Sequence, residues 1–161
     1  KKFARTLIAA AAMSVAAPAL AARVSGLPDQ PILIGPDAES EQWVSAIAAP
    51  GKLRYGVATK RRLGDRDVRV ELPGLDVRGR HVVLVDDVVS TGQTLIAAAN
   101  QLTGRGASRI SVLVTHALFV DDALSQLEDS GVTEVCSTDS VLHETNRIHL
   151  DGLLAEALSM V

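Results

Sequence analysis

The stretch HVVLVDDVVSTGQTL (residues 81–95) decides the fold. It begins with an aliphatic, largely β-branched run from His81 to Val85, as expected of a buried parallel strand. A polar loop with two carboxylates, hydroxyl side chains and a glycine follows, and an apolar helix is expected from about Leu95 to Leu102. A strand, a polar loop and a helix in this order are typical of a βαβ unit.

Strands and helices alternate on both sides of this stretch, with short connections that contain glycine. The pattern predicts further strands at residues 32–34, 55–58, 110–114 and 132–136, and helices around residues 43–48, 121–129 and 150–161. Such alternation is typical of an α/β fold with a doubly wound, mostly parallel sheet flanked by helices. Ligands of these sheets lie beyond the carboxyl ends of the strands, which here are Gly35-Pro36-Asp37, Asp86 to Thr94, and Thr115-His116.

Length and composition limit the classes of protein to which this chain can belong. A chain of 161 residues suits one globular domain, and an apolar fraction of 47% with 2% aromatic residues predicts an aliphatic core. The formal charge of −3 argues against nucleic-acid binding, which needs clustered basic residues. The single cysteine, Cys136, excludes an internal disulfide and a cysteine-based zinc site.

The N-terminal part allows two interpretations. Residues 1–21 combine a basic start, an apolar stretch and an Ala-Leu-Ala sequence, which is the layout of a secretory signal peptide. The same residues are also typical of an alanine-rich helix. The apolar stretch is too short for a membrane span, so no membrane association is expected. We therefore divide the chain into an N-terminal segment, residues 1–30, and a ligand-binding domain, residues 31–161.

Residues 86–94 carry the chemistry. Hydroxyl groups, a glycine that lets backbone amides approach closely, and the start of a helix together suit a phosphate dianion. Asp86 and Asp87 would repel that ligand unless they accept hydrogen bonds from its hydroxyl groups or share a divalent cation, and a sugar phosphate meets both conditions. The simpler interpretation is a strand followed by a Ser/Thr helix cap, which occurs in most α/β proteins.

The segment Val82 to Leu95 resembles the phosphoribosyl pyrophosphate signature of the type I phosphoribosyltransferase fold. Other segments resemble, in the same order, the C-terminal half of ribose-phosphate diphosphokinase: Gly35-Pro36-Asp37, Lys60-Arg61-Arg62, Thr115-His116, Ser137-Thr138-Asp139-Ser140 and Leu153-Leu154-Ala155-Glu156-Ala157. The resemblance covers most of the chain, from about Val15 or Pro31 onward.

This resemblance implies a role for each matching residue. Asp86 and Asp87 would bind the ribose hydroxyls, and Ser90, Thr91, Gly92, Gln93 and Thr94 would hold the 5-phosphate. Asp37 would lie near Mg²⁺, and Lys60 and Arg62, on a mobile catalytic loop, would stabilise the transferring diphosphate. From the residues alone, a solvated basic turn is the favoured interpretation of Lys60-Arg61-Arg62.

The implied reaction transfers diphosphate from ATP to ribose 5-phosphate to make phosphoribosyl pyrophosphate, in a cytoplasmic homo-oligomer. Two features depart from the family: Ala38 to Glu41 stand where many members have glycines, and no motif of the family's nucleotide-binding N-terminal half is present. A phosphoribosyltransferase and a non-catalytic sugar-phosphate-binding or regulatory homologue are therefore alternatives. His116 is expected to bind ligand or to cap its strand, and His143 and His149 to pack or face solvent.

Overall fold

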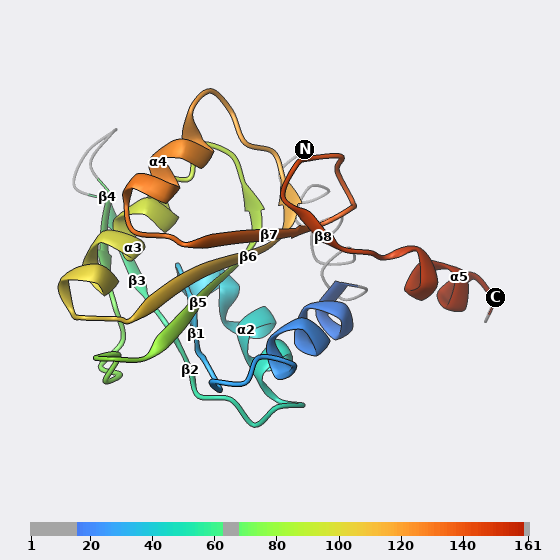
Figure 1. Ribbon diagram of the computed structural model, residues 1–161, viewed down its shortest axis with the longest axis horizontal. Helices are drawn as coiled ribbons and strands as arrows, with labels where there is room; N and C mark the ends of the chain where they lie inside the picture. Colours follow the sequence, from blue (N-terminus) through green and yellow to red (C-terminus); the bar gives the residue numbers. More distant parts are fainter. Residues whose placement is uncertain (1–15, 63–67, 160–161) are drawn as a thin grey trace.

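A six-stranded sheet forms the middle layer of the computed structural model, which describes residues 16–62 and 68–159 (Figure 1). The strand order is β2-β1-β5-β6-β7-β8, and each neighbouring pair is parallel. The strands are β1 (Ile32–Gly35), β2 (Tyr55–Val57), β5 (His81–Val89), β6 (Arg109–Ala117), β7 (Glu134–Thr138) and β8 (Asn146–Ile148). The predicted doubly wound α/β fold is confirmed.

The strand order reverses between β1 and β5. From β1 the chain runs outward to β2, and the later strands β5 to β8 extend the sheet in the opposite direction. Crossover connections therefore diverge at the carboxyl ends of β1 and β5, and a crevice opens there in folds of this kind. Gly35-Pro36-Asp37 and Asp86 to Thr94, which lie far apart in the sequence, meet at this switch point.

Helices cover both faces of the sheet, and the strand residues alternate between the two sides. In β5, Val82 and Leu84 pack with α3 (Gln93–Gly104) and α4 (Ala123–Asp129). Val83 and Val85 pack instead with α2 (Glu41–Ala48) and with the helix formed by residues 16–25. β5 is thus buried on both faces, as its continuous apolar sequence predicts.

The helix at residues 16–25 belongs to this packing. Ala16, Leu20 and Val24, at helical spacing, are at most 2% exposed, and the Arg23 guanidinium forms a 2.8 Å ion pair with Glu134 on β7. Glu134 also pairs with Arg109 on β6 at 2.8 Å. The start of the signal-like stretch lies outside the described residues, and the predicted division at residue 30 stays a prediction.

The charged segment from Lys60 to Arg69 contains two strands that the sequence pattern did not predict, and the mobility of its loop stays a prediction. Its two ends form an antiparallel hairpin of β3 (Thr59–Arg62) and β4 (Val68–Glu71), and residues 63–67 lie outside the described part. The hairpin is fixed to α3, because the Gln101 side-chain amide donates to the carbonyl oxygen of Val70. The alternation of Val68, Val70 and Leu72 with charged residues is the pattern of a strand buried on one face, and it is hidden in the sequence only by the many charged neighbours.

Two strands of the main sheet also differ from expectation. β5 continues through the two aspartates to Val89, because its backbone stays paired with β6 as far as Ala117. The short strand β8 has no apolar run that would predict it.

The last helix is α5 (Asp151–Ser159), which extends away from the body of the molecule in Figure 1, and its Leu154 is 48% exposed. A short 3-10 turn, η1 (Ala38–Ser40), joins β1 to α2. In the part of the chain that is described, no helix is long and apolar enough to cross a membrane.

Candidate active site

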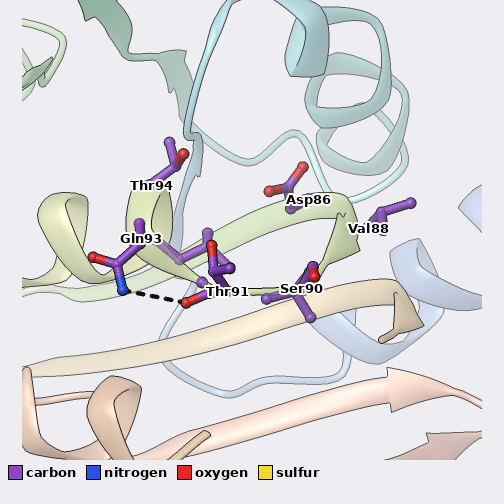
Figure 2. Close-up of a pocket in the computed structure, with 9 residues that line it drawn as sticks. Asp86, Val88, Ser90, Thr91, Gln93 and Thr94 are labelled. Carbon is purple, nitrogen blue, oxygen red and sulfur yellow. Dashed lines mark hydrogen bonds between the residues drawn. The ribbon is translucent and has the colours of Figure 1, made fainter. Parts of the chain in front are cut away.

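A hollow of about 210 Å³ opens at the carboxyl end of β5 (Figure 2). It is smaller than the roughly 300–1,000 Å³ of sites for drug-sized ligands and suits a small polar molecule. The loop of residues 90–94, called here loop 90–94, forms most of its wall. The full lining is Asp86, Val88, Val89, Ser90, Thr91, Gly92, Gln93, Thr94 and Leu95.

Loop 90–94 turns directly into α3. Gly92 is the residue before the helix and has a left-handed backbone conformation with φ of 67°. Because glycine adopts this conformation without steric cost, the chain can turn sharply there. Gly92 has no side chain with which to cap α3, so the positive end of the helix dipole faces the hollow without a capping side chain from this residue.

Asp86 places a carboxyl group at the edge of the hollow. The residue is half-buried at the surface of the hollow, and the atoms packed around its carboxyl group desolvate it. Burial first, and then the neighbouring charges of Asp87 and Asp37, raise the pKa of Asp86 well above its usual value. The Asp87 N–H donates to Asp86 Oδ1 at 2.9 Å and partly offsets this effect. A bound cation or a hydroxyl donor would relieve the same repulsion.

Asp87 and Asp37 flank Asp86 without lining the hollow. The Val88 N–H donates to Asp87 Oδ1 at 2.8 Å, which turns this carboxylate toward its own backbone. Asp37, beyond the end of β1, accepts the N–H of Glu39 at 3.1 Å and so caps η1. The switch point brings Asp37 close enough to Asp86 for the two charges to interact, although the two residues are 49 positions apart in the sequence.

Lys60 and Arg62 lie on β3, where their backbones pair with Val70 and Val68 of β4. Their side chains lie outside the described part of the chain. Their predicted catalytic role is therefore untested by the geometry.

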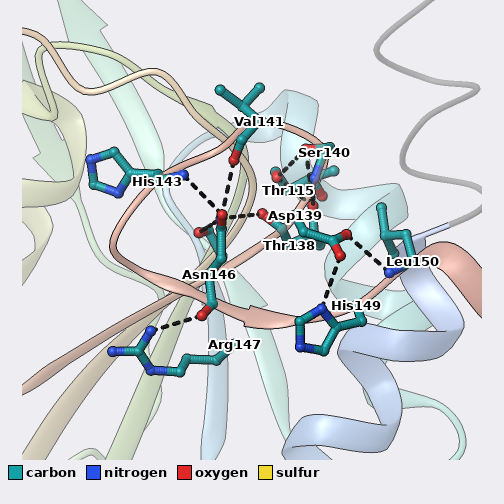
Figure 3. A network of polar contacts seen from close by, with 11 residues as sticks. Thr115, Thr138, Asp139, Ser140, Val141, His143, Asn146, Arg147, His149 and Leu150 are labelled. Carbon is teal, nitrogen blue, oxygen red and sulfur yellow. Dashed lines mark hydrogen bonds and ion pairs between the residues drawn. The ribbon is translucent and has the colours of Figure 1, made fainter.

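A polar network that the sequence did not predict adjoins the site at the ends of β6 and β7 (Figure 3). The Thr115 carbonyl oxygen accepts hydrogen bonds from Thr138 Oγ1 at 2.7 Å and Ser140 Oγ at 2.8 Å. His116 Nδ1 lies 2.9 Å from Ser140 Oγ. This contact favours the structural interpretation of His116, because its ring joins two loops.

The remaining histidines also have structural partners. The His149 Nδ1 atom lies 2.9 Å from Asp139 Oδ2, and the hydrogen bond between them is the largest contribution that lowers the pKa of Asp139. Asp139 Oδ1 accepts the Leu150 N–H at 3.0 Å, one residue before α5. The His143 ring packs against Phe119 with centroids 5.0 Å apart. Packing and surface contacts were the roles expected for these two histidines.

The described residues contain no group of three or more His, Cys, Asp or Glu side chains placed to hold a metal ion by themselves. This finding is compatible with magnesium, which is commonly held by one or two carboxylates together with substrate phosphates and water. Asp86 and Asp37, whose charges interact across the switch point, are carboxylates of the kind that such a site uses.

A parallel α/β sheet with a hydroxyl- and glycine-rich loop and an acidic pair at its switch point defines the class of this chain, the type I phosphoribosyltransferase fold. The chain belongs to the family described as phosphoribosyl synthetase-associated domain, which it matches over residues 51–161.

Relatives of known structure or name agree with this assignment. A ribose-phosphate pyrophosphokinase from Methanopyrus kandleri is 34% identical over 79% of this chain and 44% of its own length. The phosphoribosylpyrophosphate synthetase of Mycobacterium smegmatis superposes with a TM-score of 0.72, at 23% identity, over 89% of this chain and 49% of that one. Orotate phosphoribosyltransferase from Aeropyrum pernix superposes with a TM-score of 0.57 at 25% identity, over 92% and 76% of the two chains. The chain thus spans about half the length of the pyrophosphokinases it matches.

Proposed function

We propose that this chain is the sugar-phosphate-binding half of a ribose-phosphate pyrophosphokinase and binds ribose 5-phosphate in the hollow. The observation that carries the proposal is the position of loop 90–94: it lies over the N-terminus of α3 and beside the buried Asp86 carboxyl. A helix N-terminus favours an anion, whereas a carboxylate favours hydroxyl donors or a cation. A phosphorylated sugar satisfies both requirements in one molecule.

The roles follow from this placement. Backbone N–H groups and the hydroxyls of Ser90, Thr91 and Thr94 hold the 5-phosphate, with Gly92 allowing the close approach. Asp86 accepts hydrogen bonds from the ribose hydroxyls, and Asp87 orients the end of β5. The half-buried cradle excludes part of the water around the ligand and strengthens these contacts.

In the complete reaction, the C1 hydroxyl of ribose 5-phosphate attacks the β-phosphorus of ATP, and AMP leaves. Asp37 and Asp86 would hold Mg²⁺, which supplies charge neutralisation for the diphosphate. Lys60 and Arg62 would stabilise the negative charge that develops on the transferring group. The nucleotide would be held by a second half, supplied by a partner or by the remainder of a longer protein.

One alternative is a homologue that binds the sugar phosphate without catalysis. The exposed apolar side chains of Leu118, at 47%, and Leu142, at 95%, support association with another polypeptide, as does the homo-oligomer proposed for the family. A phosphoribosyltransferase is the less favoured alternative, because the chain is only 2% aromatic and offers little to stack a base.

We assign the protein to the cytoplasm because phosphorylated ribose and ATP are found there.

Calorimetric titration with ribose 5-phosphate tests the proposal. The wild-type chain is expected to bind, and Asp86→Ala with Asp87→Ala is expected to lose that binding. Asp129→Ala, an exposed carboxylate on α4, serves as the matched control and should bind normally. Failure of the wild-type chain to bind ribose 5-phosphate, with or without ATP and magnesium, would refute the proposal.

A second titration separates the alternatives. Binding of magnesium ATP by this chain alone would indicate a complete, compact enzyme. Binding of ribose 5-phosphate without ATP would indicate a half that awaits its partner, and sedimentation velocity would then show whether copies of this chain associate.

A further inference from the structure

A segment behind loop 90–94 contacts it at several independent points. The Leu118 N–H donates to the carbonyl oxygen of Val89 at 2.9 Å, and the Val120 N–H donates to that of Ser90 at 3.3 Å. The connection from β6 to α4 therefore continues the pairing of β5 and β6 beyond the sheet. It fixes the backbone at the start of the loop.

α4 packs against the turn of the loop at Gly92. A Cβ atom at Gly92 would lie 3.6 Å from Leu127 Cδ1, which is an ordinary packing distance. Leu127 is fully buried, so the turn rests on a rigid part of the core. The position of loop 90–94 thus depends on where α4 sits.

Side chains complete the connection through a chain of amide hydrogen bonds. Gln93 Nε2 donates to Gln126 Oε1 at 3.2 Å and, less closely, to the Thr91 carbonyl oxygen at 3.4 Å. Gln126 Nε2 in turn donates to Asp122 Oδ1 at 2.6 Å. Asp122 can only accept, so it sets the orientation of the Gln126 amide, and the Gln126 oxygen is thereby presented to Gln93.

We propose that Gln126, oriented by Asp122, is a positioning residue that holds Gln93 and loop 90–94 in the geometry that receives the phosphate. Gln93 lines the hollow, and its long side chain would otherwise sample many rotamers across the opening. Ordering a loop before the ligand arrives reduces the entropy lost on binding. This inference rests on the proposed function, because it names the residues that hold the proposed phosphate-binding loop in place.

Affinity for ribose 5-phosphate and for inorganic phosphate gives the first test. Gln126→Ala leaves every residue that lines the hollow intact and is expected to weaken binding about 3- to 10-fold, the range of one net hydrogen bond. Glu128→Ala, exposed on the same helix, is the matched control and should bind like the wild type. Adding Gln93→Ala to Gln126→Ala should cause no further loss beyond that of Gln93→Ala alone.

A rescue variant distinguishes positioning from general destabilisation. Gln126→Glu alone places two carboxylates together and should weaken binding. Combining Gln126→Glu with Asp122→Asn reverses the hydrogen bond between positions 122 and 126. The amide introduced at position 122 donates to the carboxylate introduced at position 126, and that carboxylate still accepts from Gln93. The pair keeps the net charge of the chain, and we expect it to restore most of the affinity.

Hydrogen exchange of the amides in residues 90–95 supplies a readout that needs no ligand. Gln126→Ala is expected to accelerate exchange there and to leave β5 and β6 unchanged. If the wild type binds but Gln126→Ala matches it in affinity and exchange, the proposal is overturned while the proposed function stands. If the wild type binds no ribose 5-phosphate, the proposed function fails, and the exchange rates alone decide whether Gln126 positions the loop.

Discussion

At the scale of single residues, Asp86 shows a conflict between ligand binding and stability. Its carboxyl group is desolvated and lies near two other carboxylates, so its pKa is raised. A protein without a functional demand at this position would gain stability by losing the charge. Sites of this kind retain such groups because the ligand or a cation relieves the repulsion on binding.

We therefore predict that Asp86→Asn unfolds at a higher temperature than the wild type at pH 7 while losing affinity for ribose 5-phosphate. The new amide keeps the acceptor for the Asp87 N–H and removes the buried charge. Each kcal/mol gained would raise Tm by about 2–4 °C in a domain of this size. Differential scanning calorimetry measures the change, and a lower Tm for the variant at pH 7 would contradict it.

The pH dependence of that difference follows from the direction of the shift. Because the pKa of Asp86 is raised in the folded state, folding favours the protonated form. The wild type loses stability relative to Asp86→Asn as the pH rises from about 4 through the folded-state value. The gap in Tm should therefore be largest at neutral pH and close in acid. Melting both proteins over the same pH series isolates Asp86 from other titrating groups.

A second residue-scale feature lies at the opposite end of β5. His81 is buried, with Nδ1 2.8 Å from Asp29 Oδ2 and Nε2 2.9 Å from Ser111 Oγ. Burial lowers the pKa of His81, and Asp29 only partly offsets it. This Asp–His–Ser chain joins the segment before β1 to the middle of the sheet, and its burial assigns it a structural role.

At the scale of elements, the approach of α2 to β1 builds the switch point. A Cβ atom at Gly35 would meet the side-chain oxygen of Ser40 and lie 3.0 Å from Val44 Cγ2. The glycine is needed because η1 turns the chain back over the end of β1. The same turn places Asp37 beside Asp86.

Gly35→Ala is accordingly expected to destabilise the fold by about 1–3 kcal/mol, the usual cost of overpacking. Gly74→Ala is the matched control, because a Cβ atom there meets nothing within 4 Å. Chemical denaturation of the two variants measures the difference. Equal stabilities would show that η1 and α2 yield without cost and would weaken the account of the switch point.

At the scale of the whole molecule, the helix at residues 16–25 covers one face of the sheet in Figure 1. Leu20 is fully buried there among residues of β1, α2 and β5. Arg23 of this helix also forms an ion pair with Glu134 on β7, which in turn pairs with Arg109 on β6.

Leu20→Ala should therefore cost about 2–5 kcal/mol, as expected for a large-to-small change in a core. Ser25→Ala, an exposed position at the end of the same helix, should change stability by less than about 0.5 kcal/mol. Urea unfolding followed by circular dichroism compares them. A Leu20→Ala variant as stable as the wild type would mean that residues 16–25 are not needed for the fold.

Local patterns were enough to predict the βαβ order, the central strand and loop 90–94, because burial on both faces and turn chemistry leave a direct trace in the sequence. The same patterns placed Asp86 beside a helix N-terminus. They did not reveal that β5 continues through both aspartates or that β8 exists, because backbone pairing with β6 and β7 decides those bounds.

The amino-acid sequence by itself determined the fold class, the acidic pair and the family, since these depend on short stretches and their order. Only the tertiary structure decided which distant groups meet. It placed Asp37 near the end of β5, paired Thr59–Arg62 with Val68–Glu71 as two antiparallel strands, and placed Gln126 behind Gln93. The physical reason is that contacts across a switch point or between two helices depend on how the layers pack, which no local periodicity records.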